Sequence, residues 1–312
     1  SVFVKQTATP CAFTSSDSWV ILSPVEQSIK RKIEAVGTPL KNWGVNIYRG
    51  ILTGCNEAFI IDEAKRAEIL ANCRDAAERK RTDALIRPIL RGRDIKRYAY
   101  EWAGLYLIAT HNGYGYTSRI DIEDYPAIKK WLDEGGIAYN GKLYKGYPQL
   151  VARADQGDTP YNLRNCAYMD DFAKPKIVWA DLARTGNAFI YDETGFTSPN
   201  TTYLIASNDT AMLKFLIGLL NSKVILQYLD WISAKLDETG WRWFKQYVEL
   251  FPIPAATAAQ QKPIIALVDR ILAAKEKDSN ADTSALESEI DALVYRLYGL
   301  TDEEIAVVEG RG

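Results

Sequence analysis

The order of helix-like and strand-like segments constrains the fold of this chain more than any other feature. Some helical patterns lie between the β-rich runs, but strands and helices do not alternate regularly as a doubly wound parallel sheet requires. We therefore expect an α+β fold with a mixed or antiparallel sheet, followed by C-terminal helices. The runs that favour strands are 45–54, 59–61, 105–110, 176–179, 188–191 and 202–206.

Helix boundaries are marked by capping residues and by glycine or proline. Ser23, Pro24 and Glu26 form a capping-box start, and Gly37 ends the helix that they begin. Gly299 has the position of a glycine that follows a helix, and Thr301 caps a short acidic helix. A last strand is expected to end at Phe251, before the boundary marked by Pro252 and Pro254. Further helices are expected at 62–80, 126–135, 208–236 with an interruption near 219–223, 258–276 and 283–298.

Length and composition are typical of a globular protein with more than one compact part. The chain has 312 residues, of which 47% are apolar and 25% charged. We divide it into 1–40, 41–254 and 255–312. No apolar run has the ~18–20 residues that a bilayer span needs, and no signal peptide is evident. An excised fragment and a trimmed start both fit the initial Ser1.

Cysteine and histidine usage argues against a metal site. The four cysteines, Cys11, Cys55, Cys73 and Cys166, are far apart, and His111 is the single histidine. Structural zinc sites usually need close Cys/His pairs, and secreted disulfide scaffolds are much shorter chains. The expected state is buried free thiols in a reducing cytoplasm.

Charge is distributed unevenly along the chain. The net charge is only −2, but Arg74–Arg97 holds nine bases and four acids, whereas Lys275–Gly312 holds four bases and ten acids. The first segment therefore carries +5 and the second −6. A basic segment in a neutral chain fits a localised phosphate-binding face, and a solvated helix with i,i+4 ion pairs fits equally well.

Several short blocks occur in the order that one known family shows. The sequence from Lys41 to Asp62 contains Gly-Ile-Leu-Thr-Gly-Cys-Asn-Glu-Ala-Phe, and 89–98 reads Ile-Leu-Arg-Gly-Arg-Asp-Ile-Lys-Arg-Tyr. Together with 161–164, 174–179, 220–223, 251–254 and the closing stretch 247–309, they cover most of the chain. The chain thus resembles the TaqI-like target-recognition domain of adenine-specific DNA methyltransferases and fused restriction–modification enzymes.

The resemblance implies a fold, a function and partners. In such enzymes the domain follows a methyltransferase domain, reads the DNA sequence, and has a small barrel-like β part followed by helices. The catalytic domain flips an adenine and methylates N6 from S-adenosylmethionine, and fused forms add a nuclease that uses Mg²⁺. Residues 1–40 would then lead from a methyltransferase domain of the same polypeptide, double-stranded DNA would be the partner, and the cytoplasm the location. A free-standing specificity subunit, an interaction scaffold and an unrelated enzyme remain alternatives.

Catalytic motifs are missing from the chain, so we predict no catalytic or cofactor-binding residue. Asn165-Cys-Ala-Tyr168 lacks the two prolines of the family's catalytic loop, and no Gly-rich loop joins a strand to a helix. Asp94-Ile-Lys96 resembles half of a nuclease site, but no preceding acid completes a metal pair. One histidine and no nucleophile elbow argue against a Ser-His-Asp hydrolase. An unrecognised enzyme site would be sought among Asp121, Asp124 and Asp181.

The candidate DNA-binding residues fall into three sets. Arginine can bind guanine O6 and N7 or clamp phosphates, so the basic block at 91–97 comes first. Its alternative is that Arg93 pairs with Asp94 to hold a loop. A polar, aromatic and basic loop follows the strand at 105–110, and an ordinary surface hairpin is its alternative. The sets are Arg91, Arg93, Lys96 and Arg97; then Asn112, Tyr114, Tyr116 and Arg119; then, more weakly, Arg164 and Arg184.

Two further segments are expected to serve packing. Trp241 and Trp243 favour a core or hinge role over DNA contact. The closing helices present the face Ile290, Leu293, Val294 and Leu297, which would either complete the core or dock on a methyltransferase domain. Packing within the chain is favoured because Pro252–Pro254 connect these helices directly to the last strand.

Overall fold

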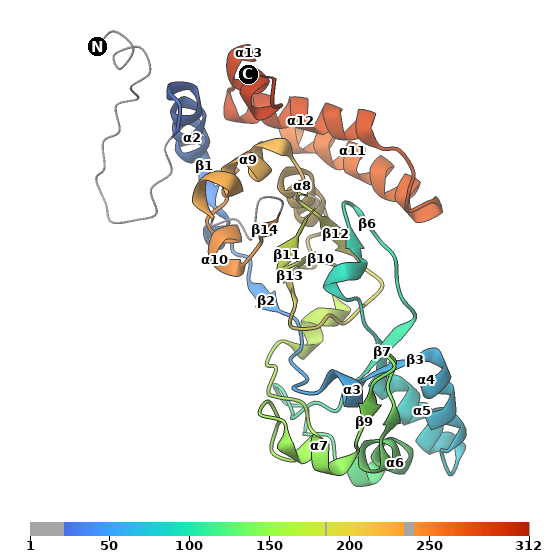
Figure 1. Cartoon of the computed structure of the whole chain (residues 1–312). Coiled ribbons are helices and arrows are strands. Elements are labelled where there is room, and N and C mark those ends of the chain that lie inside the picture. The colour runs from blue at the N-terminus through green and yellow to red at the C-terminus, as the bar shows by residue number, and fades with distance from the viewer. Residues whose placement is uncertain (1–21, 185, 234–239, 312) are drawn as a thin grey trace. The chain divides into compact units, whose positions relative to one another are not determined.

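The computed structural model describes residues 22–184, 186–233 and 240–311, and these form two compact units (Figure 1). Unit 1 holds the described residues of Ser1–Asn46, Leu182–Phe189 and Ala211–Gly312. Unit 2 consists of Ile47–Asp181 and Ile190–Thr210. The units are discontinuous in sequence, and the continuous division into 1–40, 41–254 and 255–312 stays a prediction.

Unit 2 is built on small antiparallel sheets. A three-stranded sheet has the order β3 (Ile60–Asp62), β7 (Leu105–Ile108), β4 (Ile86–Pro88). A four-stranded sheet has the order β12 (Phe189–Asp192), β10 (Lys176–Ala180), β13 (Thr202–Ala206), β2 (Ile47–Arg49), in which β13 is antiparallel to both of its neighbours, β10 and β2. Two hairpins join β5 (Ile95–Lys96) to β6 (Ala99–Tyr100) and β8 (Gly136–Ile137) to β9 (Leu143–Tyr144). The α+β class is confirmed; the implied barrel-like part is not, since the described strands form no closed barrel.

The helices of unit 2 lie within two stretches of sequence, 56–85 and 126–152. They are α3 (Asn56–Phe59), α4 (Glu63–Ala71), α5 (Ala76–Leu85), α6 (Pro126–Glu134) and α7 (Tyr147–Ala152), with 3-10 turns η2 (Gly92–Asp94), η3 (Ile122–Asp124) and η4 (Met169–Ala173). The single helix expected at 62–80 is wrong, because the chain breaks between α4 and α5. Asp75 starts the second helix by accepting a hydrogen bond from the Glu78 amide at 2.7 Å.

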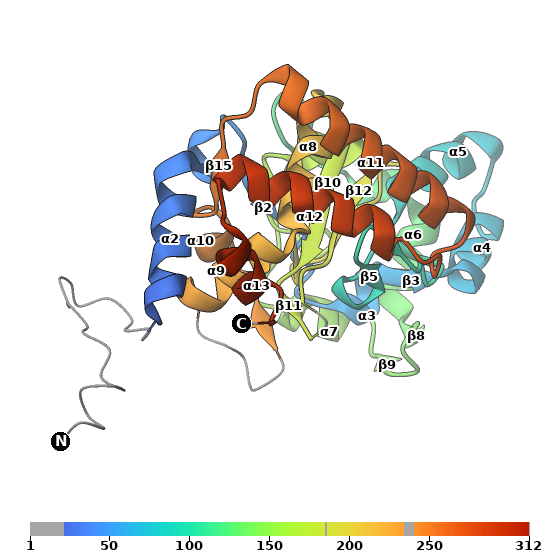
Figure 2. The same ribbon diagram turned by 90° about the horizontal axis from the view of Figure 1, so that it is seen from above.

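Unit 1 is largely helical. Its elements are α2 (Pro24–Val36), β1 (Gly37–Pro39), η1 (Leu40–Asn42), β11 (Leu182–Ala183), α8 (Thr210–Leu220), α9 (Lys223–Ile232), β14 (Trp241–Arg242), α10 (Lys245–Val248), β15 (Pro252–Pro254), α11 (Ala258–Lys277), α12 (Ser284–Tyr298) and α13 (Asp302–Val308). The helices α11 and α12 lie side by side (Figure 2). Antiparallel pairs join β1 to β15 and β11 to β14.

The capping box predicted for α2 is confirmed. Ser23 Oγ accepts from the Glu26 amide at 3.3 Å, and Glu26 Oε2 accepts from the Ser23 amide at 2.7 Å. The helix then passes directly into β1. A Cβ on Gly37 would lie 2.4 Å from the backbone of Pro252, so only glycine permits this approach of β1 to β15. The strand expected to end at Phe251 is wrong, since α10 occupies that segment and the prolines themselves form β15.

The predicted interruption of the helix at 208–236 is confirmed and has a side-chain cause. Asn221 is buried and binds both the amide and the carbonyl of Phe189, at 3.0 and 2.9 Å, and Ser222 caps α9. The helices α8 and α9 meet at 67°. No single helix among the described residues is long and apolar enough to span a bilayer, and this bent pair satisfies only the criteria of length and composition.

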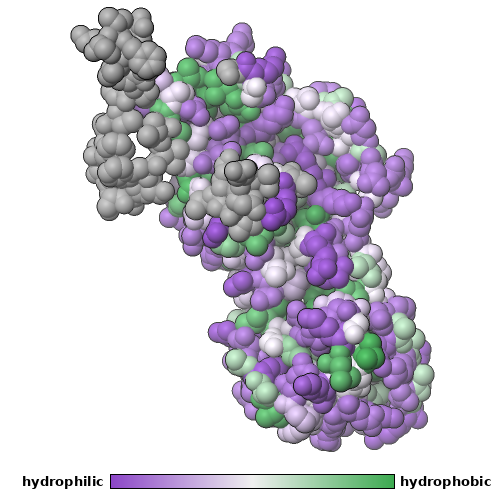
Figure 3. All heavy atoms as spheres, in the orientation of Figure 1, coloured by the Kyte–Doolittle hydropathy of each residue, from purple (hydrophilic) through white to green (hydrophobic). Residues whose placement is uncertain are grey.

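The closing helices pack within unit 1. Gly218 of α8 lies so close to α11 that a Cβ there would come within 2.7 Å of Ile264 Cγ2. Ile290 and Val294 are buried, and the Tyr298 hydroxyl donates to the Pro252 carbonyl at 2.6 Å. The predicted packing within the chain is therefore confirmed for these residues. Hydrophilic residues predominate on the face drawn in Figure 3, interrupted by smaller hydrophobic patches.

Candidate nucleic-acid interface

The basic block 91–97 forms a clamped turn followed by the β5–β6 hairpin. Asp94 Oδ2 accepts from the Arg91 amide at 3.0 Å and from Arg91 Nε at 2.9 Å, while Oδ1 accepts from Arg91 Nη2 at 2.7 Å. Asp94 is buried, and its hydrogen bonds raise the pKa of the Arg91 guanidinium. The alternative that Arg93 pairs with Asp94 is wrong, because the partner of Asp94 is Arg91.

The other bases of this block surround the tip of the hairpin. Arg93 and Lys96 are exposed, and Lys96 is paired with Glu101. The Arg97 guanidinium lies 5.8 Å from the centre of the Tyr98 ring. Tyr98 is buried with φ of 59°, a left-handed conformation that costs a bulky residue energy and is retained where the surroundings enforce it. The sequence block thus encodes a braced turn that presents Arg93, Lys96 and Arg97.

A second hairpin, residues 109–120, follows β7. Its tip closes through reciprocal backbone hydrogen bonds between Tyr114 and Thr117, at 3.1 and 2.8 Å. Tyr116 at this tip is fully exposed, whereas the Tyr114 ring packs edge-on against buried His111 at 4.9 Å. Burial, with a smaller contribution from Arg87, lowers the pKa of His111, whose Nδ1 accepts from the Gly113 amide at 3.3 Å.

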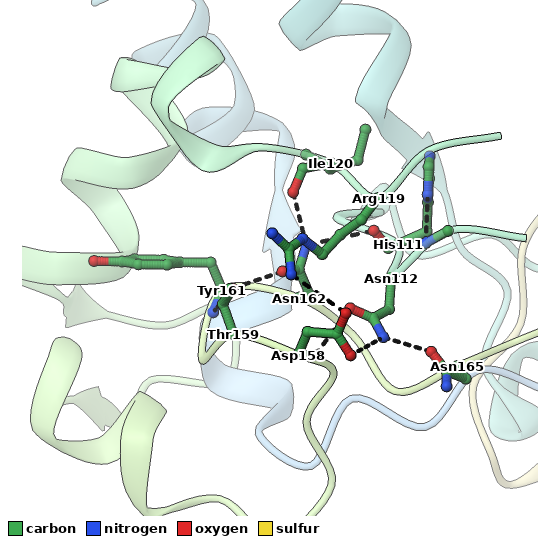
Figure 4. A network of polar contacts seen from close by, with 10 residues as sticks. His111, Asn112, Arg119, Ile120, Asp158, Thr159, Tyr161, Asn162 and Asn165 are labelled. Atoms are coloured by element: carbon green, nitrogen blue, oxygen red, sulfur yellow. Dashed lines mark hydrogen bonds and ion pairs between the residues drawn. The ribbon is translucent and has the colours of Figure 1, made fainter.

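The loop 153–167 joins this hairpin through acids and amides (Figure 4). Asn112 Nδ2 donates to Asp158 Oδ1 at 2.9 Å and to Asn165 Oδ1 at 2.5 Å, and Asn112 Oδ1 accepts from the Asp158 amide at 2.9 Å. Arg119 pairs with Asp158 at 3.3 Å. The two segments therefore share one polar network, and we call them the paired loops: hairpin 109–120 and loop 153–167.

A shallow depression of about 550 Å³ opens on the paired loops. Its rim offers the amide of Asn165, the guanidinium of Arg119 and the carboxylate of Asp158, whereas Asn112 uses both of its amide hydrogens within the network. Such a mixture of donors and acceptors can match base edges, which carry both, better than phosphates, which only accept. The lining residues are Asn112, Gly113, Tyr114, Gly115, Thr117, Arg119, Asp158, Asn165, Cys166 and Ala167.

Sequence reasoning missed Asp158 and Asn165 as members of this network. Asn165 was considered only as the start of a failed catalytic motif, and Asp158 had no local pattern that set it apart. Arg164, the weaker candidate, pairs with Asp155 at 3.1 Å beside the network. Arg184 follows β11 in unit 1, whereas the other candidates belong to unit 2.

Other residues considered from the sequence have structural contacts. Arg74 pairs with Glu78, and Arg81 donates to the Asp124 carbonyl at 2.8 Å. Trp243 is buried against Phe189 and Phe251, which confirms its core role. Cys55 and Cys166 are buried free thiols, Cys73 is a free thiol that is only half-buried, contrary to the prediction, and Cys11 lies outside the described residues. The part of the chain that the structure describes contains no group of three His, Cys, Asp or Glu side chains suited to a metal ion.

A comparison with known protein families matches residues 87–253, more than half of the chain, to the TaqI-like C-terminal specificity domain. The chain belongs to this family. The match includes the clamped turn, the β5–β6 hairpin and the paired loops, and it confirms the resemblance seen in the sequence.

Two curated relatives of the specificity domain are named type II methyltransferases. M.PaeR7I of Pseudomonas aeruginosa is 24% identical over 299 residues, which are 95% of this chain and 46% of that protein. M.BanIII of Aneurinibacillus aneurinilyticus is 26% identical over 134 residues, 42% of this chain and 23% of that protein. The chain thus spans less than half the length of either relative.

A solved structure shares the fold. MmeI, a type IIL restriction-modification enzyme in complex with DNA, aligns with 86% of this chain and 35% of its own, with a TM-score of 0.58 and 13% identity. At this identity the likeness concerns the fold alone.

Proposed function

We propose that this specificity domain reads the DNA sequence for a restriction–modification N6-adenine DNA methyltransferase whose catalytic domains lie outside the chain. The family match and the relatives' names support this proposal, and the depression on the paired loops carries it. A methyltransferase domain of the same polypeptide would bind S-adenosylmethionine, and a fused nuclease would bind Mg²⁺. The proposed location is the cytoplasm, where the DNA of bacteria such as these relatives' sources lies.

We assign cofactor binding to a domain outside this chain, because the glycines of the 109–120 hairpin form a turn rather than a cofactor loop. Gly113 and Gly115 lie in the 109–120 hairpin with φ of 86° and 53°. A nucleotide-type cofactor loop instead needs glycines between a strand and a helix N-terminus. In the proposed division of work, this chain supplies recognition and no chemistry.

Two surfaces of unit 2 would divide the contacts with DNA. Arg93, Lys96 and Arg97 at the β5–β6 hairpin would bind phosphates and set the position of the domain on the duplex. Around the depression, Arg119 and Asn165 would meet base edges, and Asn112 would hold Asp158 and Asn165 in place beside them. Tyr116 extends beyond them into solvent and is available to pack on sugars or in a groove.

Fluorescence anisotropy of a labelled duplex of mixed sequence tests the proposal with the whole chain. Each phosphate neutralised contributes about −0.9 to the slope of log K against log salt. We expect measurable binding in 50 mM salt that weakens steeply towards 200 mM, in line with this counterion release. Absent binding, or binding indifferent to salt, would rule out the DNA-reading role and favour an interaction scaffold.

The fused arrangement has its own test. Sequencing the genomic DNA upstream of the Ser1 codon should show an open frame that encodes an Asn-Pro-Pro-Tyr-type motif and a cofactor loop. A start codon directly before Ser1 would instead make the chain a free-standing specificity subunit.

A further inference from the structure

The guanidinium of Arg153, just after α7, is buried, and no carboxylate of the described residues pairs with it. Its Nη1 donates to the carbonyls of Thr53 and Asp155 at 2.7 and 2.6 Å, and its Nη2 donates to the carbonyls of Pro160, at 2.8 Å, and Asn162. Its Cζ lies 4.6 Å from the centre of the Phe59 ring. Arg153 is only 5% exposed, and this burial lowers its pKa to about 10, so it keeps its charge at neutral pH.

Asn162 transmits this constraint to the hairpin of the paired loops. The carbonyl of Asn162 faces Arg153, while its side-chain Nδ2 donates to the carbonyls of Ile120 at 2.9 Å and His111 at 3.4 Å. These two carbonyls belong to opposite strands of the hairpin, which are joined by the Ile120 amide and the His111 carbonyl at 3.1 Å. One buried amide therefore ties both strands of the hairpin to the loop that Arg153 holds.

The two loops are packed closely against each other. A Cβ on Gly157 would lie 2.6 Å from the carboxamide of Asn112 and 2.7 Å from the Leu163 carbonyl. The Leu163 amide donates to the Thr110 carbonyl at 2.8 Å, and Thr110 Oγ1 donates to the Tyr161 carbonyl at 2.7 Å. Changes in the 153–163 backbone would therefore move Asn112 and the depression that it lines.

Burial of a charge that is hydrogen-bonded to carbonyl groups rather than to a carboxylate is costly, and an apolar core residue would stabilise the fold with less penalty. What an arginine adds is direction: its planar fork fixes four carbonyls at once, which a lysine ammonium cannot reproduce. We propose that Arg153 is a positioning residue for sequence readout, acting through Asn162 to hold the paired loops in one geometry without touching DNA. This inference rests on the proposed function.

The test measures discrimination rather than affinity alone. Selection from a duplex library with a randomised centre gives the sequence that the wild-type chain prefers. Anisotropy then gives the ratio of affinities for that duplex and a scrambled one. A base-edge contact is worth about 1–3 kcal/mol, so we expect Arg153→Lys to lower the ratio about tenfold or more. Affinity for the scrambled duplex should stay within about twofold, because phosphate contacts are elsewhere.

A matched variant separates positioning from general loss of stability. Glu78→Gln removes a buried carboxylate of unit 2 that binds the Arg74 and Ala127 amides at 3.0 and 3.1 Å and touches neither loop. A variant that is merely less stable loses active protein for both duplexes equally, so Glu78→Gln should keep the wild-type ratio. An unchanged ratio in Arg153→Lys, or an equal fall in both affinities, would overturn the proposal.

Hydrogen–deuterium exchange gives a readout without DNA. In Arg153→Lys, the peptides covering 109–120 and 153–167 should both exchange faster, whereas those of α11 should match wild type. Asn162→Ala should speed exchange in the hairpin and lower the ratio as well, and it serves if the Arg153 variant does not fold. Unchanged exchange in the hairpin of both variants would refute the coupling. A wild-type chain that shows no sequence preference would instead refute the proposed function itself.

Discussion

The Arg91 guanidinium donates two hydrogen bonds to the Asp94 carboxylate, from Nε to Oδ2 at 2.9 Å and from Nη2 to Oδ1 at 2.7 Å. Asp94 is 5% exposed, so the pair is held largely away from water. Arg93, two residues after Arg91, is exposed. Arg91 therefore stabilises the turn, whereas Arg93 is available for DNA. Single substitutions can distinguish these two roles.

Arg91→Ala should act on stability. It leaves the Asp94 carboxylate buried without its main partner, which costs about 3 kcal/mol. Urea unfolding followed by fluorescence would measure the loss. Arg93→Ala is the matched control and should change the free energy of unfolding by less than about 0.5 kcal/mol. Equal effects of the two substitutions would contradict the assignment of Arg91 as the partner of the buried Asp94.

Arg93→Ala should act on DNA binding instead. A lost phosphate contact weakens binding to all sequences alike and reduces the salt slope by about 1. Anisotropy titrations with two unrelated duplexes, each at several salt concentrations, would measure both quantities. A change of preference between the duplexes would show that Arg93 reads a base, and unaltered binding would remove the β5–β6 hairpin from the interface.

Lys176 and Asp192 form a fully buried ion pair of unit 2 at 2.5 Å. Replacing Lys176 alone by an apolar residue should therefore destabilise the fold. Lys176→Met leaves a buried carboxylate, at a cost of about 3–5 kcal/mol. Adding Asp192→Leu should restore little, because Asp192 also accepts from the amides of Thr194 and Phe196 at 2.9 and 3.1 Å. Chemical unfolding of the single and double variants would decide this, and full recovery in the double variant would show that the turn does not need Asp192.

Glu304 should make unit 1 sensitive to acid. Burial alone would raise its pKa, but hydrogen bonds from Lys32, the Thr301 amide and Ser28 outweigh burial and lower the pKa below its ordinary value. Since the folded carboxyl has the lower pKa, its stabilising effect is present above about pH 4.3 and is lost as pH falls through the folded value. Melting temperatures of wild type and Glu304→Gln should differ at pH 7 by the equivalent of about 2 kcal/mol and converge as pH falls through the folded value. A constant difference across this range would argue against the ionised form.

Gly218→Ala should destabilise unit 1 although alanine is the better helix former. The new Cβ would lie 2.7 Å from Ile264 Cγ2, and overpacking costs about 1–3 kcal/mol against a helical gain of about 1 kcal/mol. Ile264→Leu removes the branched methyl and should recover part of the loss in the double variant. Thermal unfolding measures each step, and a stabilised Gly218→Ala would show that α8 and α11 can separate freely.

Local signals in the sequence predicted the helix ends well. The Ser23–Glu26 capping box, the Pro126 start of α6 and the left-handed Gly299 after α12 all have the expected roles. These features depend on residues a few positions apart, which a sequence displays directly. The break between α4 and α5 was not predicted, although Asp75 is a typical helix N-cap residue.

Features that depend on distant partners were predicted less well. The prolines of β15 seemed to end a strand, but an edge strand tolerates them, and their partner β1 is more than two hundred residues earlier. Arg91, Arg93, Lys96 and Arg97 could not be ranked before Asp94 was seen to bind Arg91. In the paired loops, Asn112 and Arg119 were found from composition, while Asp158 and Asn165 became visible only when the chain brought them to the same network.

The pairing of β1 with β15 has a consequence for how such proteins diversify. Both ends of the stretch that contains unit 2 return to unit 1, and 182–189 also belongs to unit 1. A gene crossover that exchanges one continuous block from Ile47 to Thr210 would import a foreign piece of unit 1 with it. A chimaera that keeps the native unit 1 would therefore carry two exchanged blocks, 47–181 and 190–210, around a retained native segment. A change of specificity acquired in this way would appear in the sequence as two altered segments separated by an unaltered one.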